Sequence, residues 1–285
     1  MSAKEFFELF TYTANWNLPL NLLFIGIAVI YLLLVGPMRH RFAGAEPVKE
    51  SQKFFFLMGL IVYYFTLGSP LDLLAHELFS MHMLQMSLLY IVLPPLLLLG
   101  VPAWMFRPLI KIRWIRAIGR FFTRPLIILF VFNGLLSLYH FPYIFDAIMN
   151  SMLLHFVSHA ILMFTALCMW WPIIAPVPEL DRVKPLMKLA YIFANGILLT
   201  PACALIIFAD HVLFDAYAKM SELAPVMNPI DDQQLGGIIM KIVQEVVYIT
   251  AIGFVFVRWL REQRAKDKQE LEAYFKQKNI PTPQE

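Results

Sequence analysis

Six of the seven histidines lie where the sequence predicts one end of a helical bundle. They are His76, His82, His140, His155, His159 and His211. His155 and His159 are four residues apart in an apolar stretch, so they share one helix face. An imidazole in hydrocarbon is costly without a polar partner, and in a membrane segment it marks a functional site. For several imidazoles beside methionines, the most economical partner is a soft metal ion.

Methionines and a carboxylate accompany these histidines at helical spacing. We predict that the metal ligands come from His82, Met86, His155, His159, His76 and Asp72. Thioether sulfur selects Cu(I), whereas neutral imidazole also binds zinc, iron and nickel. Taken singly, His76, His140 and His211 are better explained as polar residues at helix ends, and each methionine as a packing residue. The His155–His159 pair favours a functional role more strongly, because both residues lie inside the predicted bilayer.

A second polar group begins the last apolar stretch. Asp232 suits a helix amino terminus, and Gly236 and Gly237 permit close approach of two helices. Lys241 and Glu245 are four residues apart, so they can neutralise each other within the membrane. We interpret this ion pair as structural, with a proton or ligand relay as the alternative.

The elements that must position these residues are membrane helices. The chain has 285 residues, 60% of them hydrophobic, and a mean hydropathy of +0.66. A soluble domain does not need so much apolar surface, so the predicted fold is an all-α bundle of seven transmembrane helices in the lipid bilayer. We predict these spans at about 18–36, 54–72, 80–100, 125–141, 150–174, 187–208 and 236–258. The small net charge of +3 indicates no nucleic-acid partner.

The distribution of Lys and Arg predicts the orientation. Twenty of the 23 basic residues fall in 37–53, 101–124, 175–188 and the tail from 258, whereas Lys4 and Lys219 lie on the other side. By the positive-inside rule the N-terminus is then outside and the C-terminus cytoplasmic. We expect a seven-helix domain over 1–260 and a charged cytoplasmic tail over 261–285.

A basic amphipathic helix is expected on the inner leaflet at about 107–124. In this stretch Ile115, Ile118 and Phe122 alternate with four arginines, so that the apolar and basic residues take opposite sides of one helix. The less specific alternative is an ordinary basic loop.

The ordered set of motifs resembles the CtaG family of cytochrome c oxidase assembly factors, the membrane type of Bacillus and its relatives. The motifs are Ser69–Asp72, Ser80–Gln85, Pro94–Leu96, Gly100–Pro102, His155–His159, Trp170–Pro172 and Asp232–Met240. This resemblance implies a role in making caa-type haem–copper oxidase, with copper supplied to an oxidase subunit. It implies roles for Asp72, His82, His155, His159 and Asp232, and a bacterial plasma-membrane location.

Three other functions compete with this hypothesis. One is an enzyme, an intramembrane zinc hydrolase with a zinc-bound water as nucleophile, for which Ser158, the histidines and Asp72 supply the residue types. Another is a haem or electron carrier with two facing histidines. A transporter is weaker, because the sequence shows no repeat between its halves. We expect a non-enzymatic assembly factor that binds copper, with a soluble or anchored copper chaperone as a possible donor.

Overall fold

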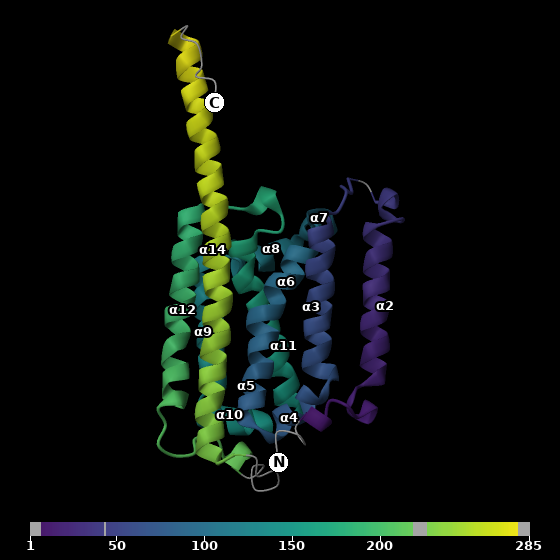
Figure 1. Ribbon diagram of the computed structural model, residues 1–285, viewed down its shortest axis with the longest axis vertical. Coiled ribbons are helices and arrows are strands. Elements are labelled where there is room, and N and C mark those ends of the chain that lie inside the picture. The colour runs from purple at the N-terminus through teal and green to yellow at the C-terminus, as the bar shows by residue number, and fades with distance from the viewer. Residues whose placement is uncertain (1–6, 43, 219–226, 279–285) are drawn as a thin grey trace.

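The computed structural model describes residues 7–42, 44–218 and 227–278, and these residues form an all-helical bundle (Figure 1). Its long apolar helices are α2 (Leu18–Val35), α3 (Glu50–Gly68), α11 (Met152–Ile174), α12 (Pro185–Ile207) and α14 (Pro229–Lys278). The segment from Phe79 to Gly100 is built from α5 (Phe79–Ser87), a π-helical turn (Leu88–Val92) and α6 (Leu93–Gly100). The π turn lies directly before Pro94 and Pro95, which cannot donate backbone hydrogen bonds.

Five of these helical segments are long and apolar enough to cross a membrane, and the number rises to seven if two bent pairs each count as one span. One pair is α3 with α4 (Pro70–Glu77), bent by 50°. The other is α8 (Arg113–Phe122) with α9 (Pro125–Tyr139), bent by 76°. The bends follow from Pro70 and Pro125, since the residue before a proline avoids the helical conformation. The predicted spans therefore match helices, although two of them are bent into their neighbours.

Two predicted segments differ from the structure. The single helix expected over 107–124 is two helices, α7 (Ala103–Lys111) and α8, because the chain leaves the helical conformation at Ile112, whose backbone is extended. The tail predicted as a separate segment from residue 261 continues α14 as helix to Lys278 (Figure 1). Lys4, Lys219 and residues 279–285 lie outside the described residues.

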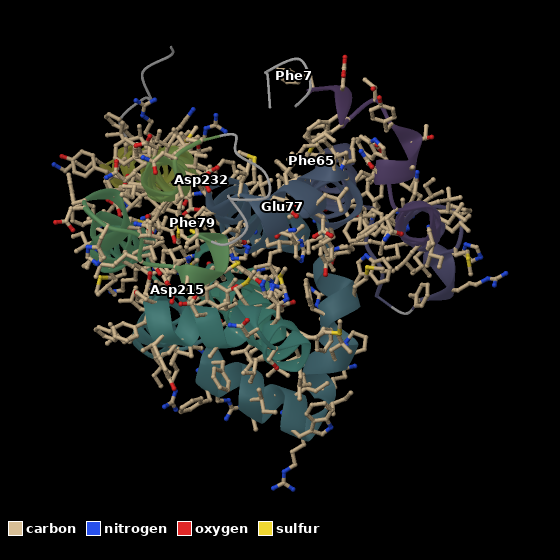
Figure 2. All side chains as sticks on the ribbon, turned by 90° about the horizontal axis from the view of Figure 1, so that it is seen from below. Phe7, Phe65, Glu77, Phe79, Asp215 and Asp232 are labelled. Atoms are coloured by element: carbon tan, nitrogen blue, oxygen red, sulfur yellow. The ribbon has the colours of Figure 1, made fainter. Side chains whose placement is uncertain are left out.

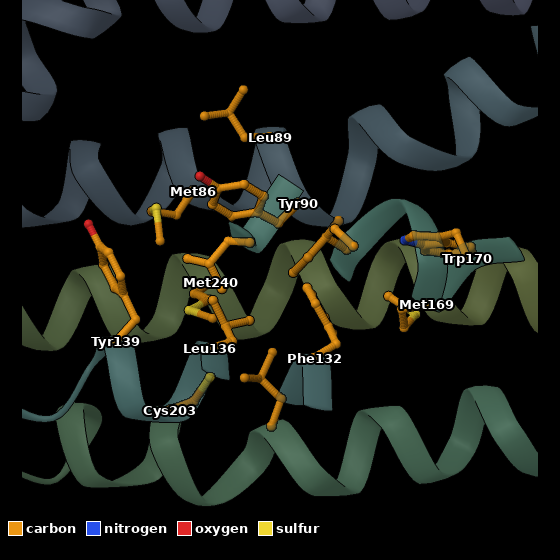
Figure 3. Close-up of a cluster of buried hydrophobic side chains, with 14 of the residues drawn as sticks. Met86, Leu89, Tyr90, Phe132, Leu136, Tyr139, Met169, Trp170, Cys203 and Met240 are labelled. Carbon is orange, nitrogen blue, oxygen red and sulfur yellow. The ribbon is translucent and has the colours of Figure 1, made fainter. Parts of the chain in front are cut away.

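The bundle has two ends, which we name for their residues. The histidine face comprises α4, α10 (Pro142–Met149) and the start of α11, while the basic face comprises α7, α8 and the loop 175–184 (Figure 1). Helix α14 packs along α12 and α5 and projects beyond the basic face, and α2 packs mainly along α3. Between the two faces lies one large core cluster, which includes Phe132, Met169 and Trp170 (Figure 3).

The glycine pair of α14 brings this helix close to its neighbours, as predicted. A Cβ added at Gly236 would lie 2.6 Å from Cδ1 of Phe79, and one added at Gly237 would lie 2.8 Å from Cγ1 of Ile207. Helix α14 therefore contacts α5 on one side and α12 on the other at the level of these two glycines.

Candidate functional site

Four imidazoles form a line that leads from the histidine face into the core. His76 lies on α4, His155 and His159 on α11, and His82 on α5. The ring centroids are 6.4 Å apart between His76 and His155, 4.2 Å between His155 and His159, and 6.4 Å between His159 and His82. His76 is exposed, His155 and His159 are partly buried, and His82 is only 2% exposed. We call these four residues the imidazole line.

The local fold explains why these residues meet. Ser69 caps α4 by accepting a hydrogen bond from the Leu71 amide, and α4 ends at Glu77, before Leu78, whose backbone is extended. The chain then turns directly into α5, so His76 and His82 lie on two successive short helices, and their rings contact those of His155 and His159 on α11. On α11 the spacing of four residues places His155 and His159 on one side, as predicted.

Two tyrosines connect the buried end of the imidazole line. The Tyr90 hydroxyl lies 2.7 Å from Nδ1 of His159, and the Tyr139 hydroxyl lies 3.3 Å from Nε2 of both His159 and His82. Neutral imidazole has one donor and one acceptor nitrogen. If Tyr90 donates to His159, then His159 donates to Tyr139 and Tyr139 donates to His82; the reverse order makes the same three hydrogen bonds.

This network has a chemical consequence for metal binding. The Nε2 atoms of His82 and His159 both approach the Tyr139 hydroxyl, so the two rings converge on one point inside the core. A hydrogen bond to the far nitrogen of a ligating histidine fixes its tautomer and orientation. Tyr90 stands in that position for His159, because it contacts Nδ1 and leaves Nε2 directed at the convergence point.

At the exposed end, Asp72 and His76 are joined through the backbone. Nδ1 of His76 lies 2.7 Å from the Asp72 carbonyl, to which it can only donate, so Nε2 of the neutral ring is free of its proton. The Asp72 carboxylate accepts a hydrogen bond of 2.8 Å from Nε2 of Gln85, which also donates to the Thr66 carbonyl. Asp72 is thus held beside the imidazole line by α5.

The remaining predicted residues are placed differently. Met86 is buried in the core cluster beside Tyr90 (Figure 3). His140 is buried and donates from Nδ1 to the Leu136 carbonyl, while its Nε2 has no hydrogen-bond partner among the described residues. His211 lies on an exposed loop, where it hydrogen-bonds Asp210 at 2.6 Å and thereby lowers the pKa of that carboxyl. His211 is therefore separate from the imidazole line.

The polar residues of α14 have structural partners. Asp232, 4% exposed, accepts hydrogen bonds from the Phe79 and Ser80 amides at 2.7 and 3.2 Å, so it caps α5 rather than its own helix (Figure 2). Lys241 and Glu245 form the predicted ion pair at 2.6 Å, and Lys241 also donates to the Thr200 hydroxyl on α12.

Within the part of the chain that the structure describes, no three His, Cys, Asp or Glu side chains already surround a common point as metal ligands. The sequence-based reasoning also overlooked Tyr90 and Tyr139. A signal for Tyr90 was available, because residues 82, 86 and 90 repeat at intervals of four and so share one face. For Tyr139 the sequence contains no such pattern beyond its position next to His140.

Comparison with known proteins agrees with the motif resemblance. A family model described as cytochrome c oxidase caa3 assembly factor matches residues 29–262, which is most of the chain and includes the whole imidazole line. Comparisons with curated proteins and with solved structures found no match.

Proposed function

The chain belongs to the family of cytochrome c oxidase caa3 assembly factors, and from this membership we propose that it carries copper to a subunit of the oxidase. Copper is here a cargo, taken up at the histidine face and released to the recipient. A soluble or membrane-anchored copper chaperone would be the donor.

The observation that carries this proposal is the imidazole line itself. Its members run from exposed His76 to buried His82, and two of its rings converge on one point within the core. Imidazole binds copper in either oxidation state, and exchange between neighbouring ligands suits a cargo that must leave again. We propose that copper enters at His76, is held by His155 and His159, and has His82 as its buried ligand.

The charges around the entrance support capture of a cation. Glu77, Asp210 and Asp215 lie on the histidine face, and Figure 2 shows Glu77 and Asp215 on it. A surface of one sign raises the local concentration of counter-ions and their rate of association. In the proposed orientation this face lies outside the bacterial plasma membrane, and the basic face lies in the cytoplasm.

Metal content tests the proposal directly. The full chain is purified in detergent from copper-replete cells, and its metals are measured by mass spectrometry in the wild type and in the His155→Ala/His159→Ala variant. We expect about one copper per chain in the wild type, because the rings of His82 and His159 converge on one point, and its loss in the variant.

The matched control is His40→Ala/His211→Ala, which removes two histidines outside the imidazole line. This control must keep its copper. Equal copper loss in both variants would show nonspecific binding to histidine and contradict the proposal. Zinc in place of copper would favour the hydrolase, and wild type without metal would rule out copper carriage under these conditions.

A further inference from the structure

The basic face contains a cavity that is separate from the imidazole line. It has a volume of about 740 Å³ and lies between the carboxyl ends of α6 and α11, the helices α7 and α8, and the loop before α12. This volume is within the range of about 300 to 1,000 Å³ that is usual for small-molecule sites. Its walls include Leu109, Phe164, Leu167 and Trp171, which are all apolar.

The polar rim of the cavity is strongly positive. Five basic side chains line it, and they are Lys111, Arg116, Arg120, Arg124 and Arg182. The one acidic lining residue, Asp181, is engaged by Lys188 at 2.6 Å. Among the described residues, no carboxylate lies within ion-pair distance of any of the five. Arg107 nearby, in contrast, pairs with Glu179.

The position of α8 places this rim at the membrane interface. Trp114, Ile118 and Phe121 are 65%, 43% and 48% exposed, so one side of α8 is apolar and open. On the other side, Ile115 and Phe122 are partly buried toward the bundle, and the ring centroids of Phe122 and Phe164 are 5.4 Å apart. An amphipathic helix with an exposed tryptophan lies at the boundary of headgroups and acyl chains.

We infer that this cavity binds one anionic phospholipid of the leaflet that adjoins the basic face. The phosphate would contact Arg120, Arg124 and Arg182, and an acyl chain would lie along Leu109, Leu167 and Trp171. Uncompensated cations around an apolar hollow fit a ligand that joins a negative head to an apolar tail. A zwitterionic lipid leaves that positive rim without a net counter-charge.

Native mass spectrometry of the full chain in detergent tests the inference. Phosphatidylglycerol and phosphatidylcholine with identical acyl chains are titrated separately. We expect one phosphatidylglycerol to bind more tightly than any phosphatidylcholine. In the Arg120→Gln/Arg124→Gln variant its affinity should fall about 30-fold, since each basic residue near a lipid surface strengthens binding severalfold.

Arg113→Gln is the matched control, because Arg113 lies on α8 but does not line the cavity. The affinity of this variant for phosphatidylglycerol should stay within about twofold of wild type. Leu109→Gln removes apolar wall without changing charge, and it should also weaken phosphatidylglycerol binding. Near-ultraviolet circular dichroism confirms that each variant is folded.

Three results would overturn the inference. Equal weakening by Arg113→Gln would indicate general surface attraction. Full competition by inorganic phosphate, with no effect of Leu109→Gln, would indicate a site for phosphate alone. Equal binding of both lipids would show that the rim does not select charge. None of these readouts involves copper, so they are independent of the proposed function.

Discussion

At the scale of single residues, Tyr139 and Tyr90 decide how the buried end of the imidazole line is organised. The Tyr139 hydroxyl lies between two Nε2 atoms, where it satisfies both rings. The network can be ordered in two opposite directions, and neither direction requires a charged imidazole. A cation at the convergence point would have to displace the Tyr139 hydroxyl, because it occupies the position that both nitrogens face.

Replacing Tyr90 by phenylalanine should weaken copper binding by about tenfold, because His159 loses the hydrogen bond that orients its ring. Competition with a Cu(I) chelator measures this affinity. The control is Tyr248→Phe, which removes a buried hydroxyl that has no hydrogen-bond partner among the described residues. If both variants lose affinity equally, Tyr90 does not act through His159.

At the scale of elements, the contact between α14 and α5 positions the imidazole line. Asp232 caps α5 three residues before His82, and Gly236 lets the helix axes approach at Phe79. Both features lie on α14, more than 140 positions further along the chain. The orientation of His82 therefore depends on a helix that contributes no imidazole.

Gly236→Ala should destabilise the bundle, because its methyl group would lie 2.6 Å from Cδ1 of Phe79. We expect a cost of about 1 to 3 kcal/mol, the usual effect of overpacking. Gly253→Ala on the same helix has no heavy atom within 4 Å and should be neutral or stabilising. Thermal unfolding in detergent measures the stability of both variants relative to the wild type. A tolerated Gly236→Ala would mean that the α14–α5 contact is loose.

Asp232→Ala should also destabilise the bundle, since the Phe79 and Ser80 amides at the start of α5 lose their hydrogen-bond acceptor. The expected cost is about 1 to 2 kcal/mol, typical of a lost helix cap. Asp232→Asn keeps an acceptor oxygen and should retain most of the stability. Similar losses in both variants would show that the charge of Asp232, rather than its hydrogen bonds, stabilises this end of α5.

At the scale of the whole molecule, the sequence predicted the helices better than their connections. Long apolar runs identified the long helices, because a helix that crosses a membrane must cover about 30 Å of hydrocarbon. The short helices α4 and α10 were missed, since eight residues are too few to show a clear period. The His155–His159 pair was predictable from local spacing, whereas the contacts of Tyr139 with His82 join residues 57 positions apart and have no local signature.

The proposed orientation predicts which positions an impermeant maleimide can reach in intact cells. The Asp210→Cys variant should be labelled, because that side chain is 94% exposed on the histidine face. Lys268→Cys, on the projecting part of α14, should react only after permeabilisation. The native cysteines are both buried, so the unsubstituted chain gives the background. The opposite labelling pattern would show that the histidine face is cytoplasmic and would contradict the proposed orientation.

The continuity of α14 also links the two ends of the molecule mechanically. As one helix of 50 residues it extends roughly 75 Å, from the turn that holds the start of α5 to a tip well beyond the basic face. If the helix moves as one body, a displacement of one end is accompanied by a displacement of the other. A protein that pulled the tip sideways would therefore shift Asp232 against the Phe79 and Ser80 amides, and would transmit that displacement to the helix that carries His82.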